Sequence, residues 1–301
     1  MKRQVYKIAP GFATHRTLLK GTRGDAGADG GLRTAGYYKE DRPDLPLFSV
    51  ITVVRNDAAH VAETILSVIH QDWDNVELIV IDGGSDDGTV DILRAYEPYI
   101  DYWSSARDGG TYDAMNKGLA LAHGRYVHFL NSGDYFTSQR VLSIVAGVMP
   151  ESGKRWLHGN ILMQDRRTGR GWIRYSNVSR YYYLFKGVPQ QAFFFERLLF
   201  DQYGNFDLKY PIVADLDFLL RVMIKNKLPG KYLDMPVAVF DTAGISGDMK
   251  RKEAERNTVI RKYYPVWTFL FINNAFFRSQ FVHNEARKRK KSLLEKFLSR
   301  F

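Results

Sequence analysis

A short apolar run at residues 126–130 leads directly into the segment Asn131-Ser132-Gly133-Asp134. A short buried strand that ends in a carboxylate beside a glycine places an acid at the carboxyl edge of a sheet, where α/β proteins bind ligands. Carboxylate oxygens suit divalent cations. Asp134 is therefore a candidate metal ligand, and Asn131 is a candidate ligand-binding residue beside it.

A second acid, Asp82, follows the apolar run at residues 76–81 and opens a glycine-rich loop that contains Ser85. The acid could accept hydrogen bonds from a ribose hydroxyl or a base N–H, and the glycines would let the backbone approach a ligand closely. Aspartate and glycine are also ordinary turn residues. Taken alone, this loop indicates a turn more strongly than a site.

The densest polar run of this half covers residues 107–118. Asp113, Asn116 and Lys117 are three or four residues apart, so they share one face at the start of a predicted helix, a face that could meet a sugar or a phosphate. A capped helix with a solvated face explains the same pattern.

Further along, Asp215 stands at a predicted helix start, with Leu219 and Val222 one and two turns behind it. Acids at helix N-termini are often only charge partners for the helix dipole. Polar groups at the edges of other predicted elements, such as Gln190 and Gln191, favour a site.

The predicted elements place these residues at one edge of a sheet. Apolar runs at 48–54, 76–81 and 126–130 predict strands, and helical periodicity lies between them. Strands that alternate with helices predict a parallel sheet. The chain has no G-x-G-x-x-G after the first strand and no P-loop motif. A divalent cation held by oxygen ligands remains the route to offset the charge of a bound diphosphate.

Composition indicates a globular protein and argues against nucleic acid. The 301 residues are 45% hydrophobic, enough for a substantial core. Residues 1–45 carry a net charge of +4 and residues 278–301 one of +6, which together account for the total of +10. A neutral body makes a nucleic-acid groove an unlikely use of this charge, and we expect no nucleic-acid partner.

The absence of cysteine suits a reducing compartment, and the N-terminus has no apolar run of signal-peptide length, so we expect a cytoplasmic protein. The glycine-rich residues 1–45 predict a mobile basic arm. Near the C-terminus, the apolar stretch at 266–277 is too short to span a bilayer, and a basic cluster follows at 287–291. That pairing within residues 263–301 favours a peripheral contact with an anionic membrane surface. A C-terminal helix packed on the body is the alternative.

In order along the chain, the motifs at residues 49–56, 80–89, 108–118 and 129–134 resemble those of family 2 glycosyltransferases, in particular the bacterial enzymes of surface polysaccharide synthesis. The resemblance runs from about residue 48 to 246. Several positions depart from the usual family pattern, including Gln190, where a histidine is frequent, and Arg55, where an aromatic residue is frequent. Gly83 stands where a second acid is frequent, Asn131-Ser132-Gly133 replaces part of an Asp-x-Asp, and Ala214 precedes Asp215 where Glu is common.

The resemblance implies a GT-A fold, a mixed and mainly parallel sheet flanked by helices, over residues 46–262. The donor half would be 46–135 and the acceptor half 136–262. It also implies a nucleotide-diphosphate sugar donor, Mn²⁺ or Mg²⁺, and inversion at the anomeric carbon. The implied roles are the catalytic base for Asp215, the metal ligand for Asp134, and donor binding for Thr52, Val53, Asp82 and Asp108. Ser85, Asn116, Lys117 and Asn131 join the predicted donor site because they stand in or beside the same motifs.

The resulting hypothesis is an inverting glycosyltransferase that moves a sugar to a glycan or lipid-linked acceptor at the inner face of the cell membrane. A carboxylate would take the acceptor proton while the cation stabilises the leaving diphosphate. One alternative is a non-catalytic nucleotide- or carbohydrate-binding subunit of a polysaccharide assembly complex. A nucleotidyltransferase should show a glycine-rich, basic first loop, and Arg55-Asn56-Asp57 is not one.

Overall fold

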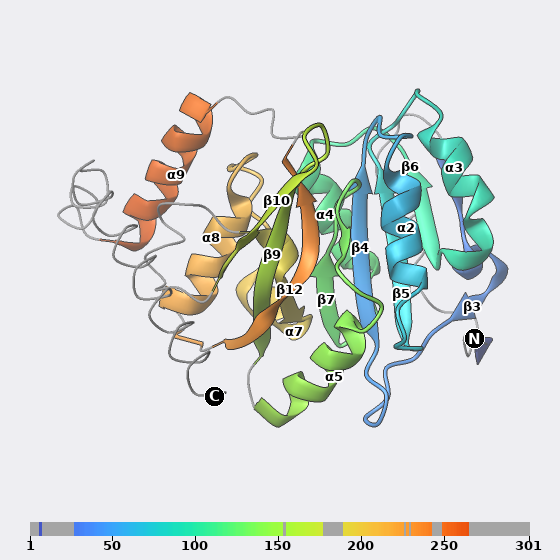
Figure 1. Cartoon of the computed structure of the whole chain (residues 1–301), viewed down its shortest axis with the longest axis horizontal. Helices are drawn as coiled ribbons and strands as arrows, with labels where there is room; N and C mark the ends of the chain where they lie inside the picture. The colour runs from blue at the N-terminus through green and yellow to red at the C-terminus, as the bar shows by residue number, and fades with distance from the viewer. Residues whose placement is uncertain are drawn as a thin grey trace.

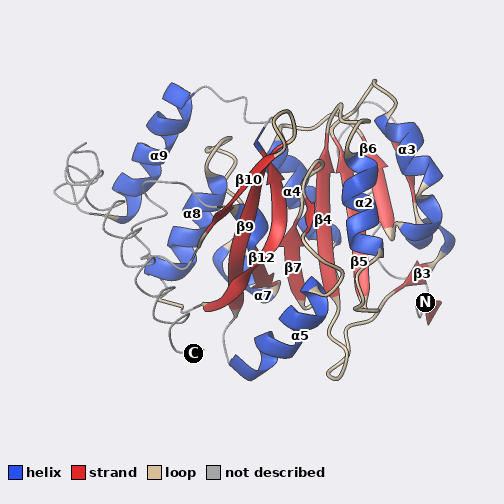
Figure 2. Cartoon of the chain, in the orientation of Figure 1, coloured by secondary structure: helices blue, strands red, loops and turns tan. Residues whose placement is uncertain are grey.

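The protein is described by a computed structural model that covers residues 6–7, 27–152, 155–176, 189–225, 227–228, 230–242 and 249–264. A central twisted sheet runs through the molecule, with helices packed on both of its faces (Figure 1). Figure 2 shows the same layers by element type, helix over strand over helix. This is the α/β architecture that the alternating pattern predicted.

The main sheet is mixed, and among the described residues it contains ten strands in the order β2-β6-β5-β4-β7-β11-β9-β12-β8, with β10 paired to β9. A separate pair is formed by β1 and β3. The strands are β1 (Tyr6–Lys7), β2 (Ala28–Gly30), β3 (Tyr37–Tyr38), β4 (Phe48–Val54), β5 (Val76–Asp82), β6 (Tyr102–Ser105), β7 (Tyr126–Phe129), β8 (Tyr135–Phe136), β9 (Trp156–Asp165), β10 (Arg170–Arg174), β11 (Phe193–Glu196) and β12 (Lys231–Asp241).

Four strands between residues 48 and 129 form a parallel block in this sheet. Strands β6, β5, β4 and β7 are neighbours and run parallel, and β11 then joins β7 to β9 through antiparallel pairings. Both β4 and β5 are buried at every residue, as expected for parallel strands covered on two faces. Because these strands run the same way, their carboxyl ends, and the acids that follow them, lie at one edge.

The helices are α2 (Val61–Ile69), α3 (Thr89–Ala95), α4 (Thr111–Leu121), α5 (Val141–Ser152), α7 (Leu198–Tyr203), α8 (Ala214–Leu220) and α9 (Met249–Tyr263). Single turns of 3-10 helix occur at η2 (Leu32–Ala35), η3 (Glu97–Tyr99) and η4 (Gln190–Ala192), and a π-helical turn, η5 (Arg221–Lys225), follows α8. In Figures 1 and 2, α2 and α4 lie on opposite faces of the parallel strands.

Aromatic packing fixes the helices of the acceptor half. The rings of Phe200 in α7 and Phe218 in α8 stack with their centroids 4.2 Å apart, and Phe206 packs on both. Phe129 of β7 contacts Phe200 and Phe206. Buried aromatic clusters of this kind contribute strongly to core stability, so the start of α8 has a fixed position relative to the end of β7.

The N-terminal segment is more ordered than the sequence indicated. Residues 27–45 are part of the body, because β2 pairs antiparallel with β6 and two cations are buried beside β5. Arg33 forms an ion pair with Glu77, and Lys39 forms one with Asp101 at 2.7 Å. The expectation of a mobile arm up to residue 45 is therefore wrong for residues 27–45. The Gly-rich composition concealed that these residues add an edge strand and neutralise buried acids.

The aromatic and basic tail predicted at 263–301 lies outside the described residues from residue 265 onward. Within the described part of the chain, every helix is too short or too polar to cross a bilayer. The prediction of a membrane contact through this tail stays a prediction.

Candidate active site

The loop at residues 131–134, here called the cation loop, is held by hydrogen bonds from α2 and its preceding turn. The Ser132 hydroxyl donates to Asp57 at 2.6 Å. Thr64 accepts from the Gly133 amide at 3.0 Å and donates to the Asp134 carbonyl at 2.7 Å. Gly133 has φ +87°, a conformation that side chains other than glycine rarely adopt. The loop is thus a preformed tight turn at the end of β7.

Asp134 is 5% exposed, and its carboxylate accepts a hydrogen bond from the side-chain amide of Gln191 at 2.7 Å. The pKa of Asp134 is raised to about 8, mainly by burial and in part by the nearby carboxylate of Asp241. Hydrogen bonds from Gln191 and from the Asp241 backbone, together with the charge of Arg166, lower the pKa but do not offset burial. A bound cation would favour the ionised form of a carboxylate in this setting.

A cavity of about 350 Å³ lies beside the cation loop. Residues of both halves of the fold line it, including Asn131 from the cation loop, Gln191 from η4 and Asp215 from α8. Since Gln191 also holds Asp134, one side chain connects the cavity that contains Asp215 with the predicted metal ligand. The cavity thereby brings together Asn131 and Asp215, which are 84 positions apart in the chain.

Asp215 is partly buried in the wall of this cavity. Burial raises the pKa of Asp215 to about 6, while hydrogen bonds from the Leu216 amide, at 2.8 Å, and from the Tyr112 hydroxyl lower it, as does the charge of Lys252. A carboxylate with a pKa just below neutrality suits a general base, since it is ionised at pH 7 and still accepts a proton readily. Tyr112 and Lys252 also line the cavity.

The oxygen atoms around the cation loop fit a divalent cation. Asp134 is a buried carboxylate with a raised pKa, and the buried Oδ1 atom of Asn131 has no hydrogen-bond partner within the described parts of the chain. Both are hard oxygen donors. The described residues contain no group of three or more His, Cys, Asp or Glu side chains arranged around a common point. A cation here would have few protein ligands, which is typical of Mg²⁺ and Mn²⁺ bound together with substrate phosphates.

Asp82 lies at the end of β5 and is fully buried. Its carboxylate accepts hydrogen bonds from the amides of Gly84 and Ser85, at 3.1 and 2.9 Å, and from the hydroxyls of Ser85 and Ser105. Through these contacts Asp82 stabilises the conformation of the loop at residues 83–85. The Ser85 hydroxyl also accepts from the Asn56 amide at 2.7 Å and ties the loop to β4.

Asp108 lies against the same loop. Its Oδ1 atom accepts from the Gly110 amide at 2.9 Å, and a Cβ at position 83 would come within 2.8 Å of its Oδ2 atom. Gly83, where the family often has a second acid, therefore leaves room for the Asp108 carboxylate. Asp82, Ser85 and Asp108 form one cluster at the carboxyl edge of β5 and β6.

Two predicted donor residues, Asn116 and Thr52, lie within the packed structure. The side-chain amide of Asn116 donates to the Phe206 carbonyl at 2.9 Å and accepts from the Phe206 amide at 3.1 Å, so it fastens the loop before α8. The Thr52 side chain is fully buried within the sheet, and its hydroxyl has no hydrogen-bond partner among the described residues. The donor roles of these two residues stay predictions. Helical spacing located Asn116 on the right face but could not show that a distant loop covers it.

Lys117 and Val53 are two further residues of the predicted donor site. Lys117 forms an ion pair with Asp113 at 2.9 Å, with both side chains about a quarter exposed. Val53 is 8% exposed, and its carbonyl accepts from the Ser132 amide at 3.0 Å. It connects β4 to the cation loop.

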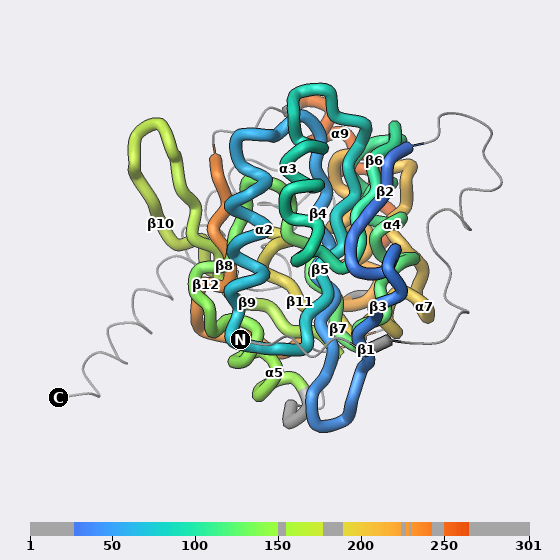
Figure 3. Tube along the Cα trace, turned by 90° about the vertical axis from the view of Figure 1, so that its right-hand side faces the viewer, coloured from blue at the N-terminus to red at the C-terminus, as the bar shows by residue number. Residues whose placement is uncertain are grey.

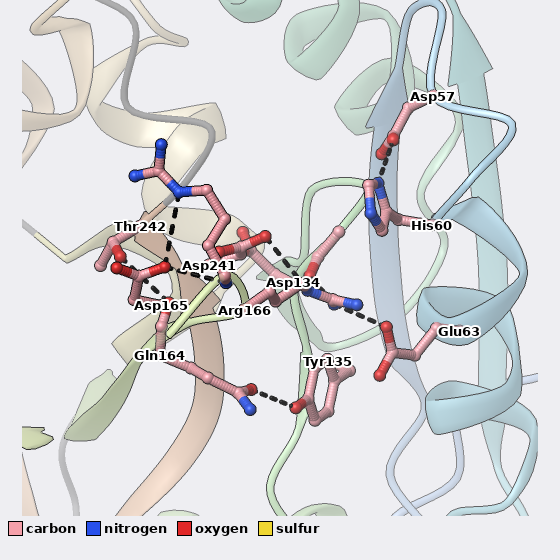
Figure 4. A network of polar contacts seen from close by, with 12 residues as sticks. Asp57, His60, Glu63, Asp134, Tyr135, Gln164, Asp165, Arg166, Asp241 and Thr242 are labelled. Carbon is pink, nitrogen blue, oxygen red and sulfur yellow. Dashed lines mark hydrogen bonds and ion pairs between the residues drawn. The ribbon is translucent and has the colours of Figure 1, made fainter. Parts of the chain in front are cut away.

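Sequence reasoning missed Gln191, Asp241 and Arg166 as members of the site. The pair Gln190-Gln191 stood out only as polar groups before a strand. Asp241 ends β12 after an apolar run, which is the signal that singled out Asp82 and Asp134. Arg166 follows β9 in a hairpin turn, and Figure 4 shows it reaching toward Glu63 and Asp241 beside Asp134. No sequence pattern predicted these ion pairs of Arg166.

The fold and the site define a class of protein. A block of four parallel strands, a buried acid on a tight loop after β7, and helices on both faces of a mixed sheet form the architecture of a GT-A glycosyltransferase. The family model for glycosyl transferase family 2 matches residues 49–208. The chain belongs to this family.

Curated relatives support the assignment. The chain is 35% identical over 229 residues to an uncharacterized glycosyltransferase, Rv1514c, of Mycobacterium tuberculosis, covering 68% of this chain and 82% of the relative. It is 33% identical over 214 residues to a PGL/p-HBAD biosynthesis glycosyltransferase of Mycobacterium bovis. That match covers 69% of this chain and 82% of the relative.

Solved structures share the fold at low identity. Staphylococcus aureus TarS 1–349 in complex with UDP-GlcNAc has a TM-score of 0.59 at 18% identity, over 77% of this chain and 74% of that chain. The mannosyltransferase PcManGT of Pyrobaculum calidifontis, in complex with GDP-Man and Mn²⁺, has a TM-score of 0.55 at 17% identity, over 76% and 68%. The predicted GT-A fold is confirmed.

Proposed function

We propose that this glycosyltransferase transfers a sugar from a nucleotide-diphosphate donor with inversion, using Asp215 as the base and a cation held at Asp134. The observation that carries the proposal is the shared cavity. Asp215, Asn131 and Gln191 line it, and Gln191 donates to Asp134. A base and a cation on adjoining sides are what displacement at an anomeric carbon requires.

In this reaction the acceptor hydroxyl attacks the anomeric carbon and its proton passes to Asp215, while the bond from that carbon to the diphosphate oxygen breaks. The cation would stabilise the charge on the leaving nucleoside diphosphate. Asp215 is the one carboxylate among the described residues that line the cavity. A single base without a second acid to act as nucleophile favours direct displacement, which inverts the configuration.

The donor nucleoside would bind at the cluster of Asp82, Ser85 and Asp108. The glycine-rich loop leaves its backbone close to any ligand at this edge, and the hydrogen bonds to Asp82 preorganise it. Nucleotide-sugar binding by structural neighbours supports a donor of this kind, since TarS is in complex with UDP-GlcNAc and PcManGT with GDP-Man and Mn²⁺. Mn²⁺ or Mg²⁺ is the proposed cation.

For the acceptor, we propose a glycan or lipid-linked molecule of bacterial surface polysaccharide or glycolipid synthesis. A relative at 33% identity is named for PGL/p-HBAD biosynthesis, which supports an acceptor of this kind. The apolar and basic composition of residues 263–301 supports work at the inner face of the cell membrane. Deleting residues 265–301 should then move the protein from the membrane fraction to the soluble fraction. Unchanged partition would contradict this part of the proposal.

Release of nucleoside diphosphate tests the central claim. Purified protein is incubated with Mn²⁺ and a panel of UDP-, GDP- and dTDP-sugars, with membrane extract as the acceptor source, and the product configuration is read by NMR. We expect release from one donor and an inverted product. Nucleotide binding without turnover across the panel would instead favour a non-catalytic binding subunit.

A further inference from the structure

The turn between β9 and β10 carries two arginines with opposite surroundings. Arg166 is 28% exposed and points into the molecule, whereas Arg167 is 77% exposed and contacts only its neighbour Asp165 in the described structure, at 3.6 Å. The β9–β10 hairpin stands out from the body in Figure 3, and Arg166 lies in its turn. The two side chains offer a matched pair for experiment.

Arg166 contacts three elements at once. Its guanidinium pairs with Glu63 of α2 at 2.6 Å and with Asp241 at the end of β12 at 3.1 Å, and it donates to the Gly133 carbonyl at 3.1 Å (Figure 4). The guanidinium also lies over the Tyr135 ring, 5.7 Å from its centroid. A planar guanidinium with five donors suits several acceptors in fixed directions, which a lysine ammonium does not.

These contacts bear directly on the cation loop. Gly133 is the residue before Asp134, and Asp241 is the second carboxylate beside Asp134. Without Arg166, the carboxylates of Asp134 and Asp241 would have less positive charge beside them. The Gly133 carbonyl would also lose a charged hydrogen-bond donor. Partners that orient the ligands of a metal are worth about 10- to 100-fold in metal affinity.

We propose that Arg166 is a positioning residue that holds the cation loop and Asp241 in the arrangement that binds the cation, and that it does so from the β9–β10 hairpin of the acceptor half. This inference rests on the proposed function for the role of the cation, but the mechanical link it describes exists in the chain without any ligand. The hairpin thereby couples the acceptor half to the donor site.

The first test needs no substrate. Hydrogen–deuterium exchange is followed in the peptide that contains residues 131–135 in the full-length wild type, Arg166→Met and the control Arg167→Met. We expect at least a tenfold faster exchange in Arg166→Met and no change in Arg167→Met. Equal protection in all three proteins would overturn the proposal. Thermal unfolding shows whether Arg166→Met is folded, and if it is not, Arg166→Lys and Glu63→Gln replace it, with intermediate exchange expected in both.

The second test measures the cation. Binding of Mn²⁺ in the presence of UDP or GDP is followed by electron paramagnetic resonance. We expect a 10- to 100-fold weaker Mn²⁺ affinity in Arg166→Met, partial recovery in Arg166→Lys, and wild-type affinity in Arg167→Met. At saturating Mn²⁺, kcat should fall by less than tenfold. Unchanged Mn²⁺ affinity with a large loss of kcat would overturn the positioning role.

The two tests separate this inference from the proposed function. If the wild type neither binds Mn²⁺ with a nucleotide nor releases diphosphate, the proposed function fails, and the exchange experiment still decides whether Arg166 holds the loop. If the wild type does both and Arg166→Met behaves like Arg167→Met, only the inference fails.

Discussion

Gln191 donates a hydrogen bond to the buried carboxylate of Asp134 at 2.7 Å while its side chain also lines the cavity that contains Asp215. Gln191 belongs to η4, directly before β11, the strand that pairs with both β7 and β9. The link between the two acids therefore depends on the antiparallel strand that joins the two halves of the sheet. Geometry at the proposed site follows from this pairing.

Asp215→Asn should abolish sugar transfer and leave donor binding intact. A general base contributes about 10²- to 10⁴-fold to the rate, and asparagine keeps the shape of the side chain but accepts no proton. The measurements are diphosphate release and calorimetry with the nucleotide. Asp201→Asn is the control, because Asp201 is an exposed residue paired with Arg197. An Asp215→Asn variant with full activity would remove Asp215 as the base.

The pH dependence of kcat/KM should show an acid limb near the pKa of Asp215, about 6. Below this pH the carboxylate is protonated and cannot act as a base, so the rate falls about tenfold for each pH unit. Rates are measured between pH 4.5 and 8 at saturating Mn²⁺. A rate independent of pH across this range would contradict the assignment.

Asp134→Asn should stabilise the protein at alkaline pH while weakening its binding of Mn²⁺. The folded-state pKa of Asp134, about 8, is above its unfolded value, so the native state binds the extra proton. The stability due to this neutral acid is fully present below about pH 4 and is lost as pH rises through 8.

Asparagine has no charge to bury, so we expect a gain of roughly 0.5–2 kcal/mol at pH 8.5 and little change at pH 4.5. Thermal unfolding without divalent cations measures the difference. Equal stability of the two proteins at both pH values would show that burial of Asp134 is not costly.

Asn116→Ala should destabilise the protein without a specific loss of donor affinity. The side-chain amide makes two hydrogen bonds with the Phe206 backbone, and its loss leaves a carbonyl and an amide without these partners. We expect a cost of about 1–3 kcal/mol in the free energy of unfolding. Urea unfolding and nucleotide calorimetry separate the two effects. A stable variant with weak nucleotide binding would restore the donor role that the sequence predicted.

Arg33→Met should destabilise the fold by about 3–5 kcal/mol, because it leaves Glu77 buried without its ion pair. Burial by itself raises the pKa of Glu77, but Arg33, His123 and Ser49 outweigh it, and the pKa is lowered. Arg23→Met, within the same glycine-rich stretch but outside the described residues, is the comparison. Equal unfolding midpoints for the two variants would indicate that the N-terminal segment contributes little to stability.

Apolar runs in the sequence predicted the strands that position the candidate site. The strand at 48–54 matches β4, Asp82 is the last residue of β5, and Asp134 follows β7. Asp215 lies in the first turn of α8. These features are local, since strand runs, helical periods and turn residues are written in contiguous sequence. The order of the motifs then indicated the family and with it the fold.

Contacts between distant segments could be decided only by the tertiary structure. Spacing placed Asn116 on a polar face, but only the folded chain shows that Phe206 occupies it. Composition made residues 27–45 look like a mobile arm, yet Arg33 and Lys39 are buried against acids that lie more than 40 residues away. Arg166 contacts the cation loop from the β9–β10 turn, and Gln191 contacts it from η4. Such contacts depend on strand order and register, which a single sequence does not encode in any local pattern.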